Sequence, residues 1–239
     1  MVFDLKLNTI NDLEDTLGIP VHTVCKLANN IDENIIVEFQ EKKNGDFREI
    51  CKPSYKLKQV QRAINRKILQ PIPISPILHG SVPQKSSKTN AEEHIGAPFV
   101  FTLDIRDFYP NIHHTRICNL YLDNGCAVDV AKLLTRLATY NGHLGQGFPT
   151  SSTLANLLLD IIAPRLDGIS KQHGLTITLY QDDLTISGGY RSPRLYNLIK
   201  KIFKQGGFRL HENEEKKKLM PKTHRQKVTG YVVNRKVNV

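Results

Sequence analysis

The stretch that decides the fold is LTITLYQDDLTIS, residues 175–187, in which two short apolar runs flank the polar sequence Gln181-Asp182-Asp183. Both runs are rich in β-branched and aliphatic residues, so they predict strands at 175–180 and 184–187 joined by a tight turn. Adjacent carboxylates in a partly desolvated turn repel each other. A divalent metal would compensate that charge, and oxygen ligands suit magnesium. Taken alone, the pair is equally compatible with a solvated surface turn.

A second apolar run, PFVFTLDI at 98–105, predicts a strand that ends near Asp104. If this strand lies beside the hairpin, Asp104 joins Asp182 and Asp183. Three carboxylates can hold two magnesium ions about 4 Å apart, and such a pair stabilises the attacking and leaving oxygens of a phosphoryl transfer. Alone, Asp104 is simply a strand end, but the joint pattern predicts a two-metal site.

The composition supports a polyanionic partner. The chain has 239 residues, and 33 Lys and Arg against 23 Asp and Glu give a net charge of +10. Nucleic acid is the commonest partner for such a surplus, although a merely basic protein is the alternative. A hydrophobic content of 40% excludes a disordered tail and fits one large domain or two small ones.

Other classes of protein are not expected. No apolar run approaches the roughly 20 residues that span a bilayer, and the start of the chain has Asp4 where a signal peptide would be apolar. The four cysteines form no C-x-x-C pair, so they predict free thiols rather than a zinc site. We therefore expect a cytoplasmic protein with no membrane partner.

Two basic blocks predict phosphate contacts. Residues 42–67 hold nine Lys or Arg, and residues 200–227 hold ten. In the first block, Arg62 and Arg66 lie largely off the apolar stripe of an amphipathic helix expected over 55–70. Such blocks can follow the backbone of a nucleic-acid duplex, although two solvated faces are the alternative.

The remaining patterns predict an α+β fold with an antiparallel sheet, because strands and helices alternate irregularly and most strands are linked as hairpins. Residues 71–98 are rich in proline and predict an irregular connection, and 206–226 a basic loop. The other expected elements are helices within 1–30 with a break at 18–20, strands at 34–40 and 47–51 around a turn at 42–46, helices over 113–123, 127–140, 150–166 and 192–205, and a final strand over 227–233.

Three ordered motifs resemble those of reverse transcriptases. The sequence Tyr180-Gln181-Asp182-Asp183 matches their Y-x-D-D box, residues 104–109 are similar to their first carboxylate motif, and residues 146–151 are similar to their glutamine–glycine loop. The resemblance covers about residues 35–234. It implies a right-hand polymerase fold with fingers and a palm, in which helices flank an antiparallel palm sheet.

Two further motifs are similar to those of bacterial retron reverse transcriptases: Asn90-Ala91-Glu92-Glu93-His94 matches N-A-x-x-H, and 228–230 matches V-T-G. In that family such motifs imply contact with a cognate RNA. The chemistry alone also allows a helix cap at Asn90 and a plain strand with a glycine bulge at 230. The expected RNA-binding residues are Asn90, His94, Val228, Thr229, Gly230, Arg62 and Arg66.

The resemblance implies the roles of the catalytic residues. Asp104, Asp182 and Asp183 are the expected catalytic carboxylates and ligands of two Mg²⁺ ions, with the Ile105 carbonyl as a further metal ligand. The implied nucleotide-binding residues are a steric gate against the ribose 2′-hydroxyl, a contact to the sugar and base, two triphosphate ligands and a lysine near the leaving pyrophosphate. They are, in that order, Tyr109, Gln146, Lys43 with Arg48, and Lys216, with Lys42 as an alternative to Lys43.

The expected organisation is linear: an N-terminal helical cap over 1–30, fingers over 31–98, a palm over 99–234 and a short end over 235–239. The family resemblance implies a helical thumb after the palm, and this sequence holds no full thumb. The thumb would then be lost by truncation, carried by a separate polypeptide, or replaced by a partner.

The expected function is RNA-directed DNA synthesis of retron type. The resemblance implies that the enzyme copies a structured noncoding RNA, which serves as template and primer, into DNA from dNTPs, with a role in antiphage defence and an effector protein or thumb-like partner. Three alternatives stay open. A group II intron-like or other bacterial reverse transcriptase would share the palm, an RNA-dependent RNA polymerase is disfavoured by Tyr109, and a non-catalytic RNA-binding scaffold is disfavoured by the three aspartates.

Overall fold

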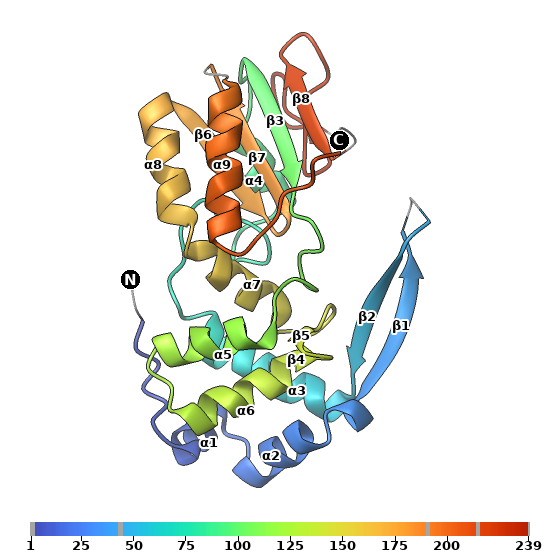
Figure 1. The fold of residues 1–239 in the computed structure, drawn as a ribbon, viewed down its shortest axis with the longest axis vertical. Coiled ribbons are helices and arrows are strands. Elements are labelled where there is room, and N and C mark those ends of the chain that lie inside the picture. Colours follow the sequence, from blue (N-terminus) through green and yellow to red (C-terminus); the bar gives the residue numbers. More distant parts are fainter. Residues whose placement is uncertain (1–2, 43–44, 190–191, 214–215, 239) are drawn as a thin grey trace. The chain divides into compact units, whose positions relative to one another are not determined.

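The computed structural model describes residues 3–42, 45–189, 192–213 and 216–238. Its contacts divide the chain into two compact units, each assembled from segments that are distant in sequence (Figure 1). Unit 1 comprises Met1–Pro73 and Tyr109–Ala155, and unit 2 comprises Ile74–Phe108 and Asn156–Val239. This division differs from the linear order expected from the sequence, because residues 74–108 pack with 156–239, and the segments before and after 74–108 pack with each other.

Unit 1 is mainly helical, and its core is formed by one apolar stripe from each helix. The Thr9 side chain caps the first helix in a capping box with Asp12, and Gly18 ends it in the left-handed conformation at φ 65°. The helices pack through buried aliphatic side chains such as Leu13, Leu57 and Val130. They are α1 (Ile10–Leu17), α2 (Val21–Asn29), α3 (Tyr55–Ile64), α5 (His114–Asp123) and α6 (Val128–Ala138), with a 3₁₀ turn η1 (Asp32–Asn34) before the first strand.

The helix expected over 55–70 ends differently from the expectation. After α3 the chain widens into a π-helical turn, η2 (Asn65–Leu69), in which the Gln70 amide donates to the Asn65 carbonyl and Ile68 and Leu69 stay buried. In this turn the Lys67 Nζ donates a hydrogen bond of 3.0 Å to the Leu17 carbonyl. One lysine of the first basic block therefore satisfies the C-terminus of α1.

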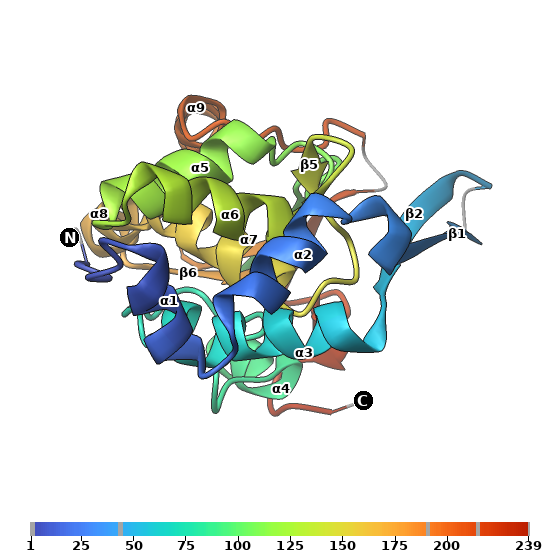
Figure 2. The same ribbon diagram turned by 90° about the horizontal axis from the view of Figure 1, so that it is seen from below.

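A long hairpin extends from the helices of unit 1 (Figures 1 and 2). Strands β1 (Ile35–Glu41) and β2 (Phe47–Pro53) pair antiparallel from Ile35 opposite Pro53 to Glu41 opposite Phe47. The side chains of Phe39 and Phe47 are exposed. The two strands expected here are confirmed, whereas Lys43, in the expected turn, lies outside the described residues.

The glycine-containing loop of unit 1 holds a second, very short hairpin that the sequence did not predict. Its strands are β4 (Thr139–Tyr140) and β5 (His143–Leu144), and the helix α7 (Ser151–Asp160) then leads into unit 2. The single helix expected over 150–166 is wrong. It is interrupted after Asp160, and α8 (Ala163–His173) begins with Pro164 in its first turn, where proline is tolerated.

Unit 2 is built on a four-stranded antiparallel sheet in the order β6-β7-β3-β8. Helices α8 and α9 (Pro193–Gln205) cover one face of this sheet, and α4 (Ser87–Glu92) lies on the other side (Figure 1). The covered face is apolar, as in the edge-to-face contact of Phe101 with Tyr196 of α9. The strands are β3 (Phe99–Asp104), β6 (Leu175–Tyr180), β7 (Asp183–Gly188) and β8 (Lys217–Pro221). The predicted α+β fold with an antiparallel sheet is confirmed.

Three elements of unit 2 correct the expectations. The basic loop after residue 206 contains β8, which completes the sheet beside β3, and the irregular stretch 71–98 contains the short helix α4. The final strand expected over 227–233 is a small hairpin of β9 (Lys227–Val228) and β10 (Tyr231–Val232). Pairing with the distant strand β3 decides β8, so its local pattern gave little signal.

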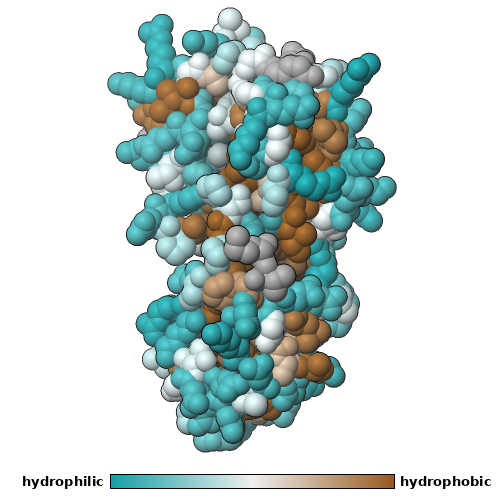
Figure 3. Space-filling view, turned by 90° about the vertical axis from the view of Figure 1, so that its left-hand side faces the viewer, coloured by the Kyte–Doolittle hydropathy of each residue, from teal (hydrophilic) through white to brown (hydrophobic). Residues whose placement is uncertain are grey.

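Polar residues dominate the face shown in Figure 3, with apolar residues in separate groups. Throughout the described chain, no helix is both long and apolar enough to cross a bilayer. All four cysteines lie within the described residues and are free thiols, as expected.

Candidate active site

The register of the sheet brings the three aspartates of unit 2 to one end of neighbouring strands. Asp104, the last residue of β3, pairs directly with Asp183, the first residue of β7. The Ile105 amide donates a hydrogen bond of 2.8 Å to the Asp182 carbonyl, so the chain after β3 lies beside the turn that carries Asp182. The sequence predicted that the three aspartates meet only if the strand that ends near Asp104 lies beside the hairpin. The structure shows that β3 and β7 are paired in this way.

The turn that carries Asp182 is tight and conformationally unusual. Gln181 and Asp182 join β6 to β7 as a two-residue connection, and Gln181 has a φ of 56°. A positive φ at the first position is typical of hairpin turns whose twist matches the strands, although glycine or asparagine is the usual residue there. The non-glycine residue implies that neighbouring groups hold this turn in place.

Residues 77–81 form a brace against the turn. The His79 amide donates to the Leu179 carbonyl at 2.7 Å, and the Gln181 Nε2 donates to the Ser81 hydroxyl at 3.1 Å. A Cβ on Gly80 would lie 2.3 Å from the Gln181 nitrogen, so no larger residue fits at this position without a shift of the turn. Sequence reasoning missed this brace, and the only signal was a glycine within a proline-rich stretch.

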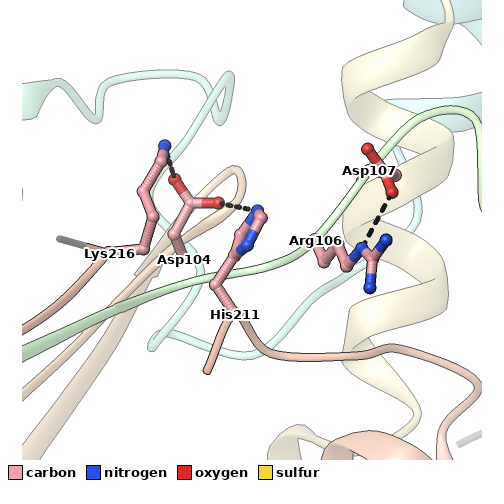
Figure 4. Close-up of polar contacts among 5 residues, drawn as sticks. All are labelled: Asp104, Arg106, Asp107, His211 and Lys216. Atoms are coloured by element: carbon pink, nitrogen blue, oxygen red, sulfur yellow. Dashed lines mark hydrogen bonds and ion pairs between the residues drawn. The ribbon is translucent and has the colours of Figure 1, made fainter. Parts of the chain in front are cut away.

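The side chains of Lys216 and His211 contact Asp104 (Figure 4). The Lys216 Nζ lies 2.8 Å from one carboxylate oxygen of Asp104, and the His211 Nε2 lies 3.5 Å from the other. Arg106 and Asp107 form a separate ion pair of 3.2 Å. The hydrogen bond to Asp104 raises the pKa of the Lys216 ammonium. His211 has no counterpart among the predicted site residues, because it lies in the loop before β8 whose path the sequence did not predict.

The neighbouring carboxylates perturb Asp183. Burial, followed by the charges of Asp182 and Asp104, raises the pKa of the Asp183 carboxyl to about 6, while Lys216 opposes the rise. Asp183 is exposed as a residue, so solvent still reaches part of it. A group of negative charges held together in this way favours an added cation, and carboxylate oxygens are the ligands that hard divalent ions prefer.

The three aspartates fit a divalent metal ion in their negative charge and in the oxygen atoms that they offer as ligands. Among the residues that the structure describes, no three His, Cys, Asp or Glu side chains are gathered as a ready metal cage. Lys216 and His211 already contact both oxygens of Asp104. Each carboxylate oxygen has a second lone pair, so these contacts leave Asp104 able to accept a metal ion.

The residues expected to bind the nucleotide fall into both units, and each is described within its own. In unit 1 the Tyr109 hydroxyl is 3.0 Å from the Ser152 hydroxyl, and Arg48 is exposed on β2. The Gln146 carbonyl accepts a hydrogen bond of 2.7 Å from the Cys51 amide. A Cβ on Gly147, whose φ is 109°, would lie 2.7 Å from the Cys51 carbonyl, so glycine lets this loop approach β2 closely. Lys216, in unit 2, contacts Asp104.

Two residues expected to contact RNA are buried instead. Asn90 is 0% exposed and His94 is 1% exposed, and both ring nitrogens of His94 form hydrogen bonds inside unit 2. Val228 is also fully buried. These positions correct the expectation of direct contact, because a side chain enclosed by protein cannot reach a nucleic acid. The alternative of a helix cap at Asn90 is also wrong, since Ser86 caps α4.

The two retron-like motifs pack against each other. The Thr229 hydroxyl donates to the Ser87 carbonyl of α4 at 2.8 Å, and a small apolar cluster joins the motifs. Gly230 is exposed, and Arg62 and Arg66 are both exposed on α3 and η2. The cluster is formed by Ala91, Val100, Val228 and Val233.

Comparison with known proteins agrees with this geometry. Residues 40–233 match the family described as reverse transcriptase (RNA-dependent DNA polymerase). The chain is 33% identical over 213 residues to the retron Mx65 reverse transcriptase of Myxococcus xanthus, which covers 81% of this chain and 49% of that protein. It is 30% identical over 238 residues to the retron Ec86 reverse transcriptase of Escherichia coli, which covers 95% of this chain and 72% of that protein.

A solved structure supports the fold. The structure of telomerase from Candida albicans in complex with a TWJ fragment of telomeric RNA is similar, with a TM-score of 0.54 over 86% of this chain and 47% of that chain. At 11% identity this likeness concerns the fold alone. The chain spans about half the length of the Mx65 relative and nearly three quarters of the Ec86 relative.

Proposed function

The chain belongs to the retron branch of the reverse transcriptase family, and from this premise we propose that it is an RNA-directed DNA polymerase that copies a structured noncoding RNA into DNA. The observation that supports this activity best is the pairing of Asp104 with Asp183 at the end of β3 and β7, next to the turn that carries Asp182. A scaffold that only bound RNA would gain nothing from three mutually repelling carboxylates at one sheet edge.

In this proposal Asp104, Asp182 and Asp183 hold two Mg²⁺ ions, with the Ile105 carbonyl as a further ligand. When bound, these ions would lower the pKa of the primer hydroxyl and neutralise the leaving oxygens. Lys216 contacts Asp104 at 2.8 Å, so it lies beside the carboxylates and its ammonium can stabilise the leaving pyrophosphate. The carboxylates and this lysine thus supply both signs of charge that phosphoryl transfer needs.

The nucleotide-binding roles belong to residues that lie mainly in unit 1. Tyr109 would exclude a ribose 2′-hydroxyl and so select deoxynucleotides, and Gln146 would lie along the sugar and base. Arg48 would hold the triphosphate through its bidentate fork, together with Lys43 or Lys42. The exposure of Arg48 on β2 leaves its guanidinium accessible for this role.

The proposed partners follow from charge and family. Exposed Arg62 and Arg66 would contact the phosphates of the RNA or its hybrid with DNA, and exposed Gly230 with the neighbouring Thr229 would line an RNA contact. The RNA would serve as template and primer, and an effector protein or a thumb-like partner would complete the assembly. We place this activity in the cytoplasm and in antiphage defence, consistent with four free thiols and with retron relatives.

The test is primer extension on an RNA template with dNTPs and Mg²⁺, comparing the intact chain with Asp182→Asn/Asp183→Asn. The matched control is Asp167→Asn, which changes a half-buried aspartate of α8 that pairs with Lys171. We expect the double variant to lose synthesis by at least about a thousandfold, because the carboxylates act on the reacting atoms, and the control to keep it.

The same assay with ribonucleotides tests the steric gate, since Tyr109→Ala should admit them if the ring excludes the 2′-hydroxyl. Synthesis that survives in the double variant would refute the assigned carboxylates. RNA binding without synthesis, both with this template and with RNA that copurifies from cells, would refute the polymerase and favour a scaffold.

A further inference from the structure

The sheet of unit 2 has one polar face, and the catalytic carboxylates lie at its end. Directly paired residues share a face, so the Asp104–Asp183 pair lies on the same face as the pairs two and four residues further along the strands. The neighbouring strand β6 contributes Tyr180 opposite Asp183, Thr178 opposite Thr185, and Thr176 opposite Ser187. This face therefore carries hydroxyl groups immediately behind the carboxylates.

His94 binds two of these hydroxyl groups from the end of α4. Its Nδ1 is 2.7 Å from the Ser187 Oγ on β7, and its Nε2 is 2.8 Å from the Thr178 Oγ1 on β6. One imidazole thus connects the two strands of the catalytic hairpin. A neutral imidazole has one donor and one acceptor nitrogen, so either tautomer can make both bonds with hydroxyl partners.

The three polar groups are buried as a set. Thr178 and Ser187 are 3% and 2% exposed, and the environment keeps His94 neutral because burial lowers its pKa to about 4. Removing the imidazole would leave two buried hydroxyls without this partner, which is costly in a protein interior. An apolar side chain could fill the space but would not favour one strand register over another. The two hydrogen bonds of His94 form only in the register that puts Tyr180 opposite Asp183.

The helix α4, which ends two residues before His94, is itself fixed by the second retron-like motif. Thr229 donates to the Ser87 carbonyl at the start of α4, and Val228 packs on Ala91 in the small apolar cluster. The His94 amide then bonds the Ala91 carbonyl at 3.1 Å. A continuous set of contacts leads from the 228–230 turn through α4 to the strands behind the catalytic turn.

We propose that His94 is a positioning residue of the polymerase, which ties β6 to β7 through Thr178 and Ser187 and thereby fixes Tyr180 opposite Asp183 beside the turn that carries Asp182. This inference rests on the proposed function and assigns the N-A-x-x-H motif to the palm rather than to RNA. Thr178 lies two residues behind Tyr180 and Ser187 lies four residues behind Asp183, about 7 Å and about 13 Å along their strands. Loss of the bridge would let the carboxylates drift while the outer surface of unit 2 is unchanged.

The experiment compares His94→Phe, which keeps a planar ring without hydrogen bonds, with His94→Gln, which keeps a donor and an acceptor. Ser187→Ala is a milder variant that removes one of the two bonds and a single oxygen. Three quantities are measured: kcat and KM for dNTP in primer extension, the half-saturating Mg²⁺ concentration, and Mn²⁺ affinity by electron paramagnetic resonance. The last quantity needs no synthesis.

For His94→Phe we expect kcat to fall about tenfold or more, because small displacements of catalytic groups are costly. The half-saturating Mg²⁺ concentration and the Mn²⁺ dissociation constant should both rise severalfold, and KM for dNTP should stay constant. Ser187→Ala should show the same changes at smaller size, and His94→Gln should stay within about threefold of the wild type. Loss of folded protein alone would lower the apparent kcat and leave both metal constants unchanged.

The proposal is overturned if His94→Phe and Ser187→Ala keep wild-type metal constants, or if His94→Gln behaves as His94→Phe does. If His94→Phe does not fold, the comparison of Ser187→Ala with the wild type decides by the same criterion. If the wild-type chain makes no DNA, the proposed function fails but this inference is still tested, because Mn²⁺ affinity reports on the carboxylates directly.

Discussion

The two long hairpins, β6–β7 and β1–β2, have the same topology but differ in how far the protein encloses them. In β6–β7 nearly every strand residue between Leu175 and Ser187 is buried or half-buried, and a brace, a histidine bridge and the neighbouring strand β3 hold it. In β1–β2 most residues are exposed, and the pair forms a two-stranded sheet by itself. Isolated two-stranded hairpins are marginally stable in water.

The difference indicates which step of the proposed reaction each hairpin serves. Carboxylates that must meet metal ions with small tolerance benefit from a turn fixed before any ligand arrives. Basic residues that capture a triphosphate benefit from an accessible hairpin, whose ordering the ligand itself can stabilise. Substitutions of residues that support the β6–β7 hairpin should therefore change kcat, and substitutions on the β1–β2 hairpin should change KM for dNTP.

The largest effect is expected at the brace. Gly80→Ala places a Cβ 2.3 Å from the Gln181 nitrogen, so the turn with Asp182 must move. We expect kcat for primer extension to fall about a hundredfold, the size that a displacement of about 1 Å can cause. Overpacking should also lower the free energy of unfolding by about 1–3 kcal/mol.

The matched control is Gly168→Ala in α8, where an added Cβ would meet nothing within 4 Å. Alanine in an open helical position should keep activity and stabilise the fold by about 0.5–1 kcal/mol. Steady-state kinetics and urea unfolding measure both variants. Full activity of Gly80→Ala would show that residues 77–81 do not determine the position of the turn.

The sequence predicted the two hairpins because each is a local pattern. Alternating or apolar runs around polar turns appear within 15 residues of sequence, and the three aspartates stand at the predicted strand ends. It did not predict β8, whose strand character comes from pairing with β3 more than 100 residues earlier. The order β6-β7-β3-β8 likewise depends on contacts that no local window contains.

The residues of the candidate site also fall into those that the sequence predicted and those that it did not. Asp104, Asp182 and Asp183 were recognisable as charged residues at the ends of apolar strands. The pairing of β3 with β7 brings them together. His211 and Gly80 were not recognisable, because their importance lies in what they touch. The N-A-x-x-H motif was recognised but its place was misjudged, since burial of a polar helix depends on tertiary packing that its composition does not reveal.

Acid should weaken the interior behind the β6–β7 hairpin. Burial lowers the pKa of His94 and of His79 to about 4, below the value near 6.5 of an unfolded histidine. The unfolded chain therefore binds more protons between these values. The stability that the neutral histidines permit is complete above pH 6.5, and it falls by up to about 3 kcal/mol per group as the pH drops toward 4. The raised pKa of Asp183 has the opposite sign and offsets part of this loss.

Urea unfolding at pH 7.0, 5.5 and 4.5 measures the effect, and His94→Gln isolates one histidine from the opposing carboxylate. The wild type should lose more free energy of unfolding on acidification than the variant. An equal loss in both would mean that His94 does not stay neutral in the fold. The two histidines interact, so a double variant with His79→Gln should recover less than the sum of the single changes.

The smallest effect on stability, and the sharpest test of the contrast between the hairpins, is expected at Arg48. Its side chain is exposed on β2, so Arg48→Ala should change the free energy of unfolding by less than about 0.5 kcal/mol. If its guanidinium holds the incoming triphosphate, KM for dNTP should rise about tenfold, the usual size for the loss of a charged hydrogen bond, while kcat stays near the wild-type value. Lys52→Ala on the same strand is the control, because Lys52 pairs with Glu38 across the hairpin and has no expected nucleotide role. A fall in kcat without a change in KM would instead make Arg48 part of the catalytic step, and the division of labour between an open binding hairpin and a fixed catalytic hairpin would be lost.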